Sequence, residues 1–215
     1  MDAGEYRERL RLELADLGVA TWEDDTLDQA LRQALEDYND VNPDQAIATH
    51  TFASASREAA LSASTFARLI RVLRVWLPYT ASDPEHPPKW RAGFELWPGN
   101  ILYIADDPEP AASDVARVWF ARAQTVEGLD AAASTTLPGE HSQMLVTGSS
   151  GYAASARASA LRETVSAEDD SYKQTAGFAF RRLNEFRAGL NRIRARAAGG
   201  YVALPVQRRG RVPRQ

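Results

Sequence analysis

Residues 172–197 have the sequence YKQTAGFAFRRLNEFRAGLNRIRARA, which contains no proline. Small and apolar residues recur in it at alternating spacings of three and four, which places them on one stripe of a helix. The stripe consists of Ala176, Ala179, Leu183, Phe186, Leu190, Ile193 and Ala197. Asp169, Asp170 and Ser171 precede the helix and are expected to cap it, and Gly199 and Gly200 are expected to close it. The sequence therefore predicts a long amphipathic helix near the C-terminus.

The chain continues beyond this helix with YVALPVQRRGRVPRQ at 201–215, which has neither a helical nor a strand period. Two interpretations stay open for these residues: a frayed chain end, and a basic arm that becomes ordered against a partner. In the second interpretation, alternating apolar side chains would fill pockets or extend a sheet edge, while arginines would pair with carboxylates or with phosphates. The residues assigned to such an arm are Tyr201, Val202, Leu204, Val206, Arg208, Arg209, Arg211 and Arg214.

The two ends of the chain carry opposite charge. Residues 1–45 contain thirteen acidic residues and four arginines, and residues 178–215 contain ten arginines and one acid, Glu185. The whole chain of 215 residues has a formal net charge of −4, which does not suggest a general nucleic-acid binder. Unlike ends can pair within one chain or between neighbouring subunits of an assembly, and both arrangements remain open.

The sequence offers little support for catalysis or metal binding. It contains no cysteine, and its three histidines, His50, His86 and His141, lack the spacing of a helical metal pair. The segment Gly-Ser-Ser-Gly at 148–151 fits neither a nucleophile elbow nor a phosphate-binding loop, and it suits close helix packing instead. We therefore expect no metal, no cofactor and no enzymatic activity.

Because the sequence shows no basic-then-apolar leader and no apolar run of about 20 residues, we expect a soluble protein made in a cytoplasm.

Helical patterns flank a central region of strand-like sequence. Two helices are predicted within residues 5–41, the first over 5–17 and the second from the acidic cluster at 23–25 to about Val41. Leu31 and Leu35 are expected to be buried against the first helix and the C-terminal pair. Two further helices are predicted within residues 139–197, where small residues at 148–151 allow a neighbouring helix to come close.

The central residues 47–123 form the predicted β region. Strand-like runs occur at 47–53, 59–61, 69–77, 94–97, 101–104 and 115–123. The turn Pro98-Gly99-Asn100 separates two of these runs, which is a signal for a hairpin. Four of the five tryptophans lie in the region, and we expect them to form its core.

The predicted fold class is α+β. It is an antiparallel helical bundle of two N-terminal and two C-terminal helices, with an inserted small antiparallel β-sheet and an extended C-terminal arm. Residues 1–198 are expected to form a single domain, and residues 199–215 are expected to form the arm.

Several short motifs occur in a fixed order along the chain. They are LRLEL at 10–14, WEDDTLDQAL at 22–31, FELW at 94–97 with Tyr103, VWFARA at 118–123 with Thr125, Val126, Gly128 and Leu129, TTLP at 135–138, and FRRLNEFR at 180–187 with Leu190. In this order and spacing, the chain resembles the head–tail connector (adaptor) proteins of tailed bacteriophages and prophages. The proline-rich loop at 80–89 and the arginine-rich tail depart from a typical member.

This resemblance implies a structural protein of the virion neck, assembled in the host cytoplasm. Such proteins form a ring of twelve subunits that docks beneath the portal protein, passes genomic DNA through its centre and binds a stopper or tail component. The family has no catalytic residues, and the arm at 201–215 would bind the portal. A channel that passes DNA should not attract phosphates, so we expect Glu23, Asp24 and Asp28 on lumen or inter-subunit surfaces.

Two other classes of function stay open at this point. A DNA-binding regulator would use the basic C-terminal helix through Arg181, Arg182, Arg187, Arg192, Arg194 and Arg196. The acidic whole chain and the lack of a helix-turn-helix pattern speak against it. A hydrolase would use His50 or His141, although no nucleophile motif accompanies either histidine.

Overall fold

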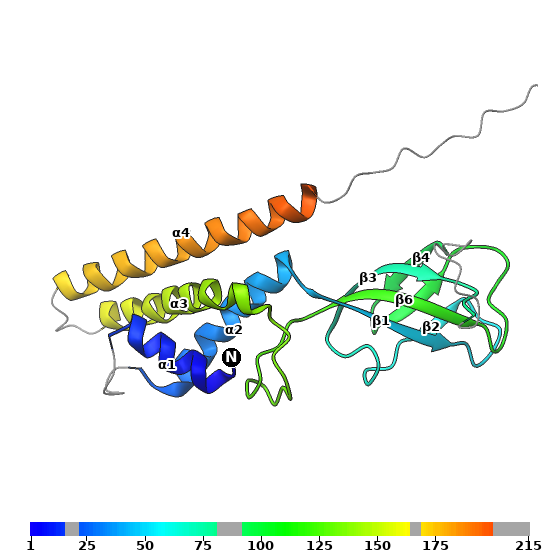
Figure 1. The fold of residues 1–215 in the computed structure, drawn as a ribbon, viewed down its shortest axis with the longest axis horizontal. Coiled ribbons are helices and arrows are strands. Elements are labelled where there is room, and N and C mark those ends of the chain that lie inside the picture. The colour runs from blue at the N-terminus through cyan, green and yellow to red at the C-terminus, as the bar shows by residue number, and fades with distance from the viewer. Residues whose placement is uncertain (16–21, 81–91, 164–168, 200–215) are drawn as a thin grey trace, which may run out of the picture.

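The computed structural model describes residues 1–15, 22–80, 92–163 and 169–199. It contains both helices and antiparallel sheets, so the α+β class is confirmed. Four helices gather at one end of the elongated molecule, and the strands form a β unit that projects from them (Figure 1). Among the described residues, no helix has the length and apolarity needed to cross a bilayer.

The helical layer consists of α1 (Ala3–Glu13), α2 (Asp24–Val41), α3 (Ser142–Glu163) and α4 (Asp169–Gly199), and a short 3-10 turn, η1 (Gly139–His141), precedes α3. In Figure 1, α4 runs back along α3, and α1 and α2 lie on the other side of α3. The second helix matches its predicted bounds, with Asp24 and Asp25 in its first turn. Helix α1 begins earlier than predicted, because Asp2 and Glu5 form a reciprocal capping box.

Helix α4 also begins earlier than predicted. Asp169, Asp170 and Ser171 belong to the helix rather than preceding it as caps. Acidic residues suit the first turn of a helix as well as the cap position, so composition alone does not fix the boundary. Gly199 is the last helical residue, and Gly200 lies outside the described residues.

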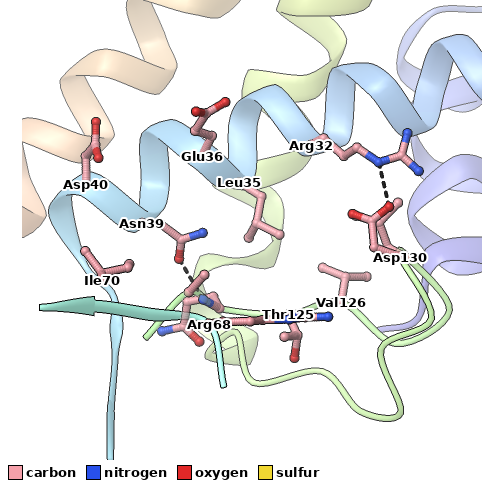
Figure 2. Close-up of a pocket in the computed structure, with 13 residues that line it drawn as sticks. Arg32, Leu35, Glu36, Asn39, Asp40, Arg68, Ile70, Thr125, Val126 and Asp130 are labelled. Atoms are coloured by element: carbon pink, nitrogen blue, oxygen red, sulfur yellow. Dashed lines mark hydrogen bonds and ion pairs between the residues drawn. The ribbon is translucent and has the colours of Figure 1, made fainter. Parts of the chain in front are cut away.

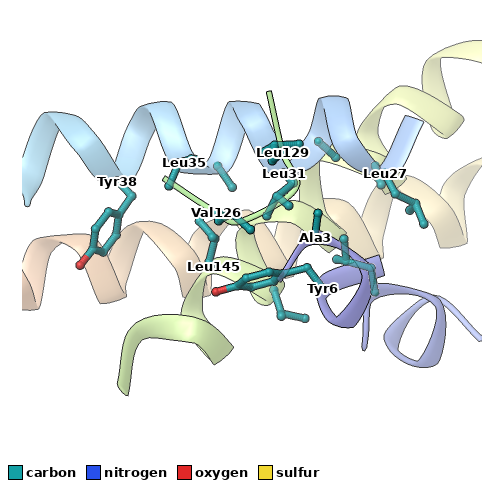
Figure 3. Close-up of a cluster of buried hydrophobic side chains, with 14 of the residues drawn as sticks. Ala3, Tyr6, Leu27, Leu31, Leu35, Tyr38, Val126, Leu129 and Leu145 are labelled. Carbon is teal, nitrogen blue, oxygen red and sulfur yellow. The ribbon is translucent and has the colours of Figure 1, made fainter. Parts of the chain in front are cut away.

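A single apolar core holds the helical layer together (Figure 3). Its side chains come from all four helices and from the segment around Val126 and Leu129. Leu31 is fully buried and Leu35 is 8% exposed, so the predicted burial of both is confirmed. The predicted α4 stripe also faces inward, because Ala179, Phe186 and Leu190 are buried.

Glycines set the close approach of α3 and α4. A Cβ atom on Gly148 would lie 2.8 Å from the ring of Phe186, and one on Gly151 would lie 3.1 Å from the backbone nitrogen of Leu183. On the facing helix, a Cβ on Gly189 would lie 2.6 Å from the sulfur of Met144. The expected packing role of the Gly-Ser-Ser-Gly segment is therefore confirmed.

The β unit contains two sheets, so the prediction of one small sheet is wrong. The first sheet has the order β1 (Asp44–Thr51), β6 (Val115–Arg122), β3 (Leu69–Trp76). The second has the order β2 (Glu58–Ala60), β5 (Ile101–Ile104), β4 (Phe94–Trp97), and it contains the predicted hairpin. All pairings are antiparallel, and strand periodicity alone does not say which strands pair.

The core between the two sheets is built from phenylalanine and aliphatic residues rather than from tryptophan. Its most buried members include Phe66, Leu102, Val118 and Phe120. Of the described tryptophans in this region, Trp76 is buried, Trp119 is half-buried, and Trp97 is 36% exposed and stacked on Tyr103 at 4.5 Å. The expectation of a tryptophan core is wrong because Trp119 alternates with Val118 and Phe120 and thus occupies the opposite face. Trp90 lies outside the described residues.

Polar contacts fix the β unit to the helical layer. Strands β1 and β6 leave the layer side by side, with Asp44 opposite Arg122 and a 2.7 Å bond from Arg122 Nε to the Asp44 carboxylate. Beyond β6, the backbone N–H of Gln124 donates to Asn39 Oδ1 at 2.7 Å, and the Gln124 side chain donates to the Asn42 carbonyl at 3.2 Å. The end of α2 is thereby tied to both strands.

Candidate interaction surfaces

The exposed side of α4 is basic. Arg181, Arg187, Arg192, Arg194 and Arg196 are all exposed, and within the described residues none of them forms an ion pair. Because the apolar stripe of α4 faces α3, the charged residues are left on the remaining surface of the helix. This surface can bind a partner that carries carboxylates or phosphates.

Arg182 behaves differently from the other α4 arginines. Its guanidinium lies 3.3 Å from the Glu13 carboxylate of α1 and 3.1 Å from Glu185, and it stands over the ring of Phe178 at 5.4 Å. In the described part of the chain, this ion pair with Glu13 joins the acidic and basic ends of the sequence. The other arginines of the helix remain available for contacts outside it.

The expected acidic residues near the N-terminus have unlike environments. Asp28 is 8% exposed and accepts two hydrogen bonds of 2.7 Å from Arg7, and this carboxylate raises the pKa of Arg7. Asp24 is exposed and accepts a hydrogen bond from Arg11, which lowers the Asp24 pKa. Glu23 is exposed. Asp28 thus ties α1 to α2 and offers little to a lumen, whereas Glu23 and Asp24 can contribute to an outer surface.

The outward face of α2 forms a second charged surface. Asp25, Gln29, Gln33, Glu36 and Asp40 recur every three or four residues and are all exposed. We call these five residues the acidic ridge. The sequence-based prediction considered only the apolar face of this helix and did not identify the acidic ridge. The spacing of three or four residues between its members is nevertheless visible in the sequence.

A groove lies where α2, the start of β3 and the segment 123–130 come together (Figure 2). Its volume is about 460 Å³, and Leu35, Ile70, Val126 and Leu129 contribute its apolar walls. An ion pair of 2.9 Å between Arg32 and Asp130 closes one side of it. Apolar walls beside this charged pair suit the groove to contact with a partner.

The two described histidines lie in different parts of the molecule. His50 is on β1, with its ring edge-on to Phe52 at 5.3 Å, and burial lowers its pKa. His141 is in η1, where its Nδ1 shares a 2.6 Å hydrogen bond with the hydroxyl of Tyr38, and this hydroxyl also accepts a 2.6 Å hydrogen bond from Asn42. The histidine contact with Tyr38 joins α2 to the start of α3, a role that the spacing of these residues does not reveal.

Other sequence-predicted features fall outside the described residues. The arm residues from Tyr201 to Arg214, the proline-rich loop from 81 onward and His86 all belong to this group. Within the described ranges, no group of three or more histidine, aspartate or glutamate side chains could hold a metal ion.

Comparisons with known proteins place the chain in no family. No protein-family model matches it, and no curated protein is significantly similar to it.

Proposed function

We propose that this chain is the subunit of a head–tail connector of a tailed phage. The four helices, as an antiparallel bundle, form the body of a ring of twelve copies beneath the portal protein. Genomic DNA passes through the ring, and the projecting β unit faces a stopper or tail component in the virion neck. The proposal includes no catalytic activity.

The observation that carries this proposal is the set of exposed α4 arginines that form no ion pair within the described residues, in a chain of net negative charge. Five exposed arginines lie on one helix, while an acidic ridge lies on α2. Opposite charges on two faces of one subunit favour head-to-tail association, which closes into a ring when the rotation between subunits allows it. The order of sequence motifs that resembles the connector proteins supports the same assignment.

The elongated shape offers a second line of support. The helical layer and the β unit lie at opposite ends of the molecule (Figure 1). A connector subunit needs separate surfaces for its neighbours in the ring and for the next component of the neck. Two distinct structural parts in one chain supply such surfaces.

A DNA-binding regulator is the second candidate, because phosphates would also bind the α4 arginines. The acidic ridge on the same helical layer would repel a duplex that approached from the side of α2. Arg182 is already engaged by Glu13 and Glu185, which leaves fewer free cations than the sequence suggests.

Measuring self-assembly and DNA binding on the same protein preparation distinguishes the connector subunit from the DNA-binding regulator. Size-exclusion chromatography with light scattering, at several protein concentrations, should detect masses that are multiples of 23.7 kDa. Electron microscopy of DNA-filled, tailless heads incubated with the protein should then show a ring at the portal vertex. A protein that stays monomeric, leaves heads unchanged and shifts short DNA duplexes at physiological salt would support the regulator instead.

A further inference from the structure

Three exposed arginines of α4 lie on the side of the helix opposite its buried apolar stripe. Arg181, Arg192 and Arg196 are separated by eleven and four residues, which places them on one side of an α-helix. Arg192 and Arg196 border a hollow of about 440 Å³ that also contacts Gln143 and Met144, near the start of α3. We call these three residues the arginine ridge.

Helix α2 packs against α3, where its Asp37 accepts a hydrogen bond from Tyr152. Glu36 of the acidic ridge and Arg187 of α4 both act electrostatically on this tyrosine. One flank of α4 faces α1, through the ion pair of Arg182 with Glu13. Within the described residues, no ion pair joins the arginine ridge to the acidic ridge, so both ridges can bind another copy of the chain.

The two ridges match in length and in charge. From Asp25 to Asp40 and from Arg181 to Arg196, each spans fifteen residue steps, which is about 22 Å along a helix. The acidic ridge carries three carboxylates and two amides, and the arginine ridge carries three guanidinium groups. Glu185 lies on the same side as the arginines, but Arg182 already holds it at 3.1 Å.

Small residues allow another helix to approach the arginine ridge. Ala188 is exposed between Arg181 and Arg192, and Gly189 borders the hollow. Between Arg181 and Arg192, a helix that lies over this part of α4 meets Glu185, which Arg182 holds, and otherwise small residues. Amides such as Gln33 can hydrogen-bond to arginines across such a contact.

We propose that the acidic ridge of one copy of the chain packs against the arginine ridge of the next copy. The contact is head-to-tail, because each copy presents both ridges on different helices. This inference rests on the proposed ring and specifies which helices meet in it. In this contact, carboxylates on α2 of one copy pair with guanidinium groups on α4 of the next copy, and the two helices lie parallel or antiparallel.

The natural absence of cysteine makes the contact directly testable. Gln33→Cys and Ala188→Cys place one thiol on each ridge at exposed positions and leave every ridge charge in place. A disulfide requires Cα atoms within about 7 Å, so it forms only if the ridges meet. Mild oxidation of the full-length double variant should give a ladder of covalent oligomers, while each single variant should give no species beyond a dimer.

A matched control uses Ala188→Cys with Ala111→Cys, which puts the second thiol on an exposed loop of the β unit. This pair should give no ladder. The Gln33→Cys, Ala188→Cys ladder should weaken about tenfold near 1 M salt, where the screening length falls to about 3 Å. Arg192→Glu with Arg196→Glu should weaken it similarly, and adding Glu36→Arg with Asp40→Arg should restore it.

The outcomes separate this inference from the proposed function. If electron microscopy shows rings on heads but the double variant gives only dimers or no cross-link, the ridge contact is wrong and the connector assignment stands. If charge reversal leaves the ladder unchanged, the electrostatic pairing of the ridges is wrong. If neither heads nor concentrated protein show any ring and no ladder forms, the connector function itself is overturned.

Discussion

At the scale of single residues, the ion pair of Arg7 and Asp28 is the best-defined polar contact in the helical layer. Both of its bonds measure 2.7 Å, and Asp28 is buried although it belongs to the acidic N-terminal segment. We predict that Asp28→Asn lowers the free energy of unfolding by about 1–3 kcal/mol, because the half-buried guanidinium of Arg7 loses its charged partner. Urea denaturation followed by circular dichroism measures this loss.

Asp25→Asn is the control for this prediction. Asp25 lies in the first turn of the same helix but is exposed, so its substitution should change stability by less than about 0.5 kcal/mol. Equal effects of the two substitutions would show that Asp28 acts only through the general charge of the segment.

Tyr152 makes stability depend on alkaline pH. Burial, together with the Asp37 carboxylate that accepts its hydrogen bond, raises the pKa of Tyr152 from 10.0 to about 12. Between about pH 10 and pH 12, the Tyr152 hydroxyl therefore keeps its proton in the folded protein but has lost it in the unfolded chain. The contribution is therefore fully present below about pH 10 and is lost as pH rises toward 12.

We predict that Tyr152→Phe removes this contribution, so that the free energy of unfolding of the variant falls less than that of wild type as pH rises. The difference in unfolding free energy between wild type and variant should shrink steadily between about pH 10 and pH 12, as measured by urea titrations at each pH. Tyr6 and Tyr38 also have raised pKa values through burial, but they are present in both proteins and cancel in the comparison. A pH-independent difference would mean that Tyr152 contributes no titrating interaction.

At the scale of elements, the pairing of α3 with α4 depends on glycines at the contact. We predict that Gly148→Ala lowers the free energy of unfolding by about 1–3 kcal/mol, because the added methyl group would overlap the fully buried ring of Phe186. Thermal and urea denaturation both report this change.

Gly177→Ala provides a matched control on the exposed side of α4. A Cβ at Gly177 meets no atom within 4 Å, so alanine should stabilise the helix by about 0.5–1 kcal/mol. If both substitutions stabilise the protein, the helices have room to separate and the close contact is not a constraint.

At the scale of the whole molecule, the proposed arm should act in assembly and not in folding. Among the residues whose burial the structure describes, the last buried apolar residue of the helical core is Leu190. We predict that deletion of residues 201–215 leaves the melting temperature within about 1 °C of wild type and abolishes attachment to the portal. Scanning calorimetry and sedimentation with DNA-filled heads measure the two effects.

A second arm variant separates charge from apolar contact. Serine at positions 208, 209, 211 and 214 removes the arginines and keeps Val202, Leu204 and Val206. Reduced attachment that becomes less sensitive to salt would indicate that the arginines pair with carboxylates or phosphates. Wild-type attachment by the truncated protein would show that another surface binds the portal.

The sequence by itself determined the elements of this protein. The spacing of Leu27, Leu31 and Leu35 predicted the buried face of α2, and the turn at 98–100 predicted the β4–β5 hairpin. Both signals are local, because the spacing of a helix face and the residues of a three-residue turn lie within a short stretch of sequence. Helix ends were less well determined, because acidic residues are favourable both at the N-cap position and in the first turn of a helix.

Only the tertiary structure decided which elements meet and which charges remain free. It divided the strands into two sheets, turned Trp97 and Trp119 away from the core, and buried Asp28 against Arg7. Among the described residues it also left the acidic and arginine ridges without an ion pair between them, which the net charge of each chain end could not reveal. Long-range pairings of this kind depend on packing between segments far apart in sequence, and periodicity within one segment carries no information about its partner.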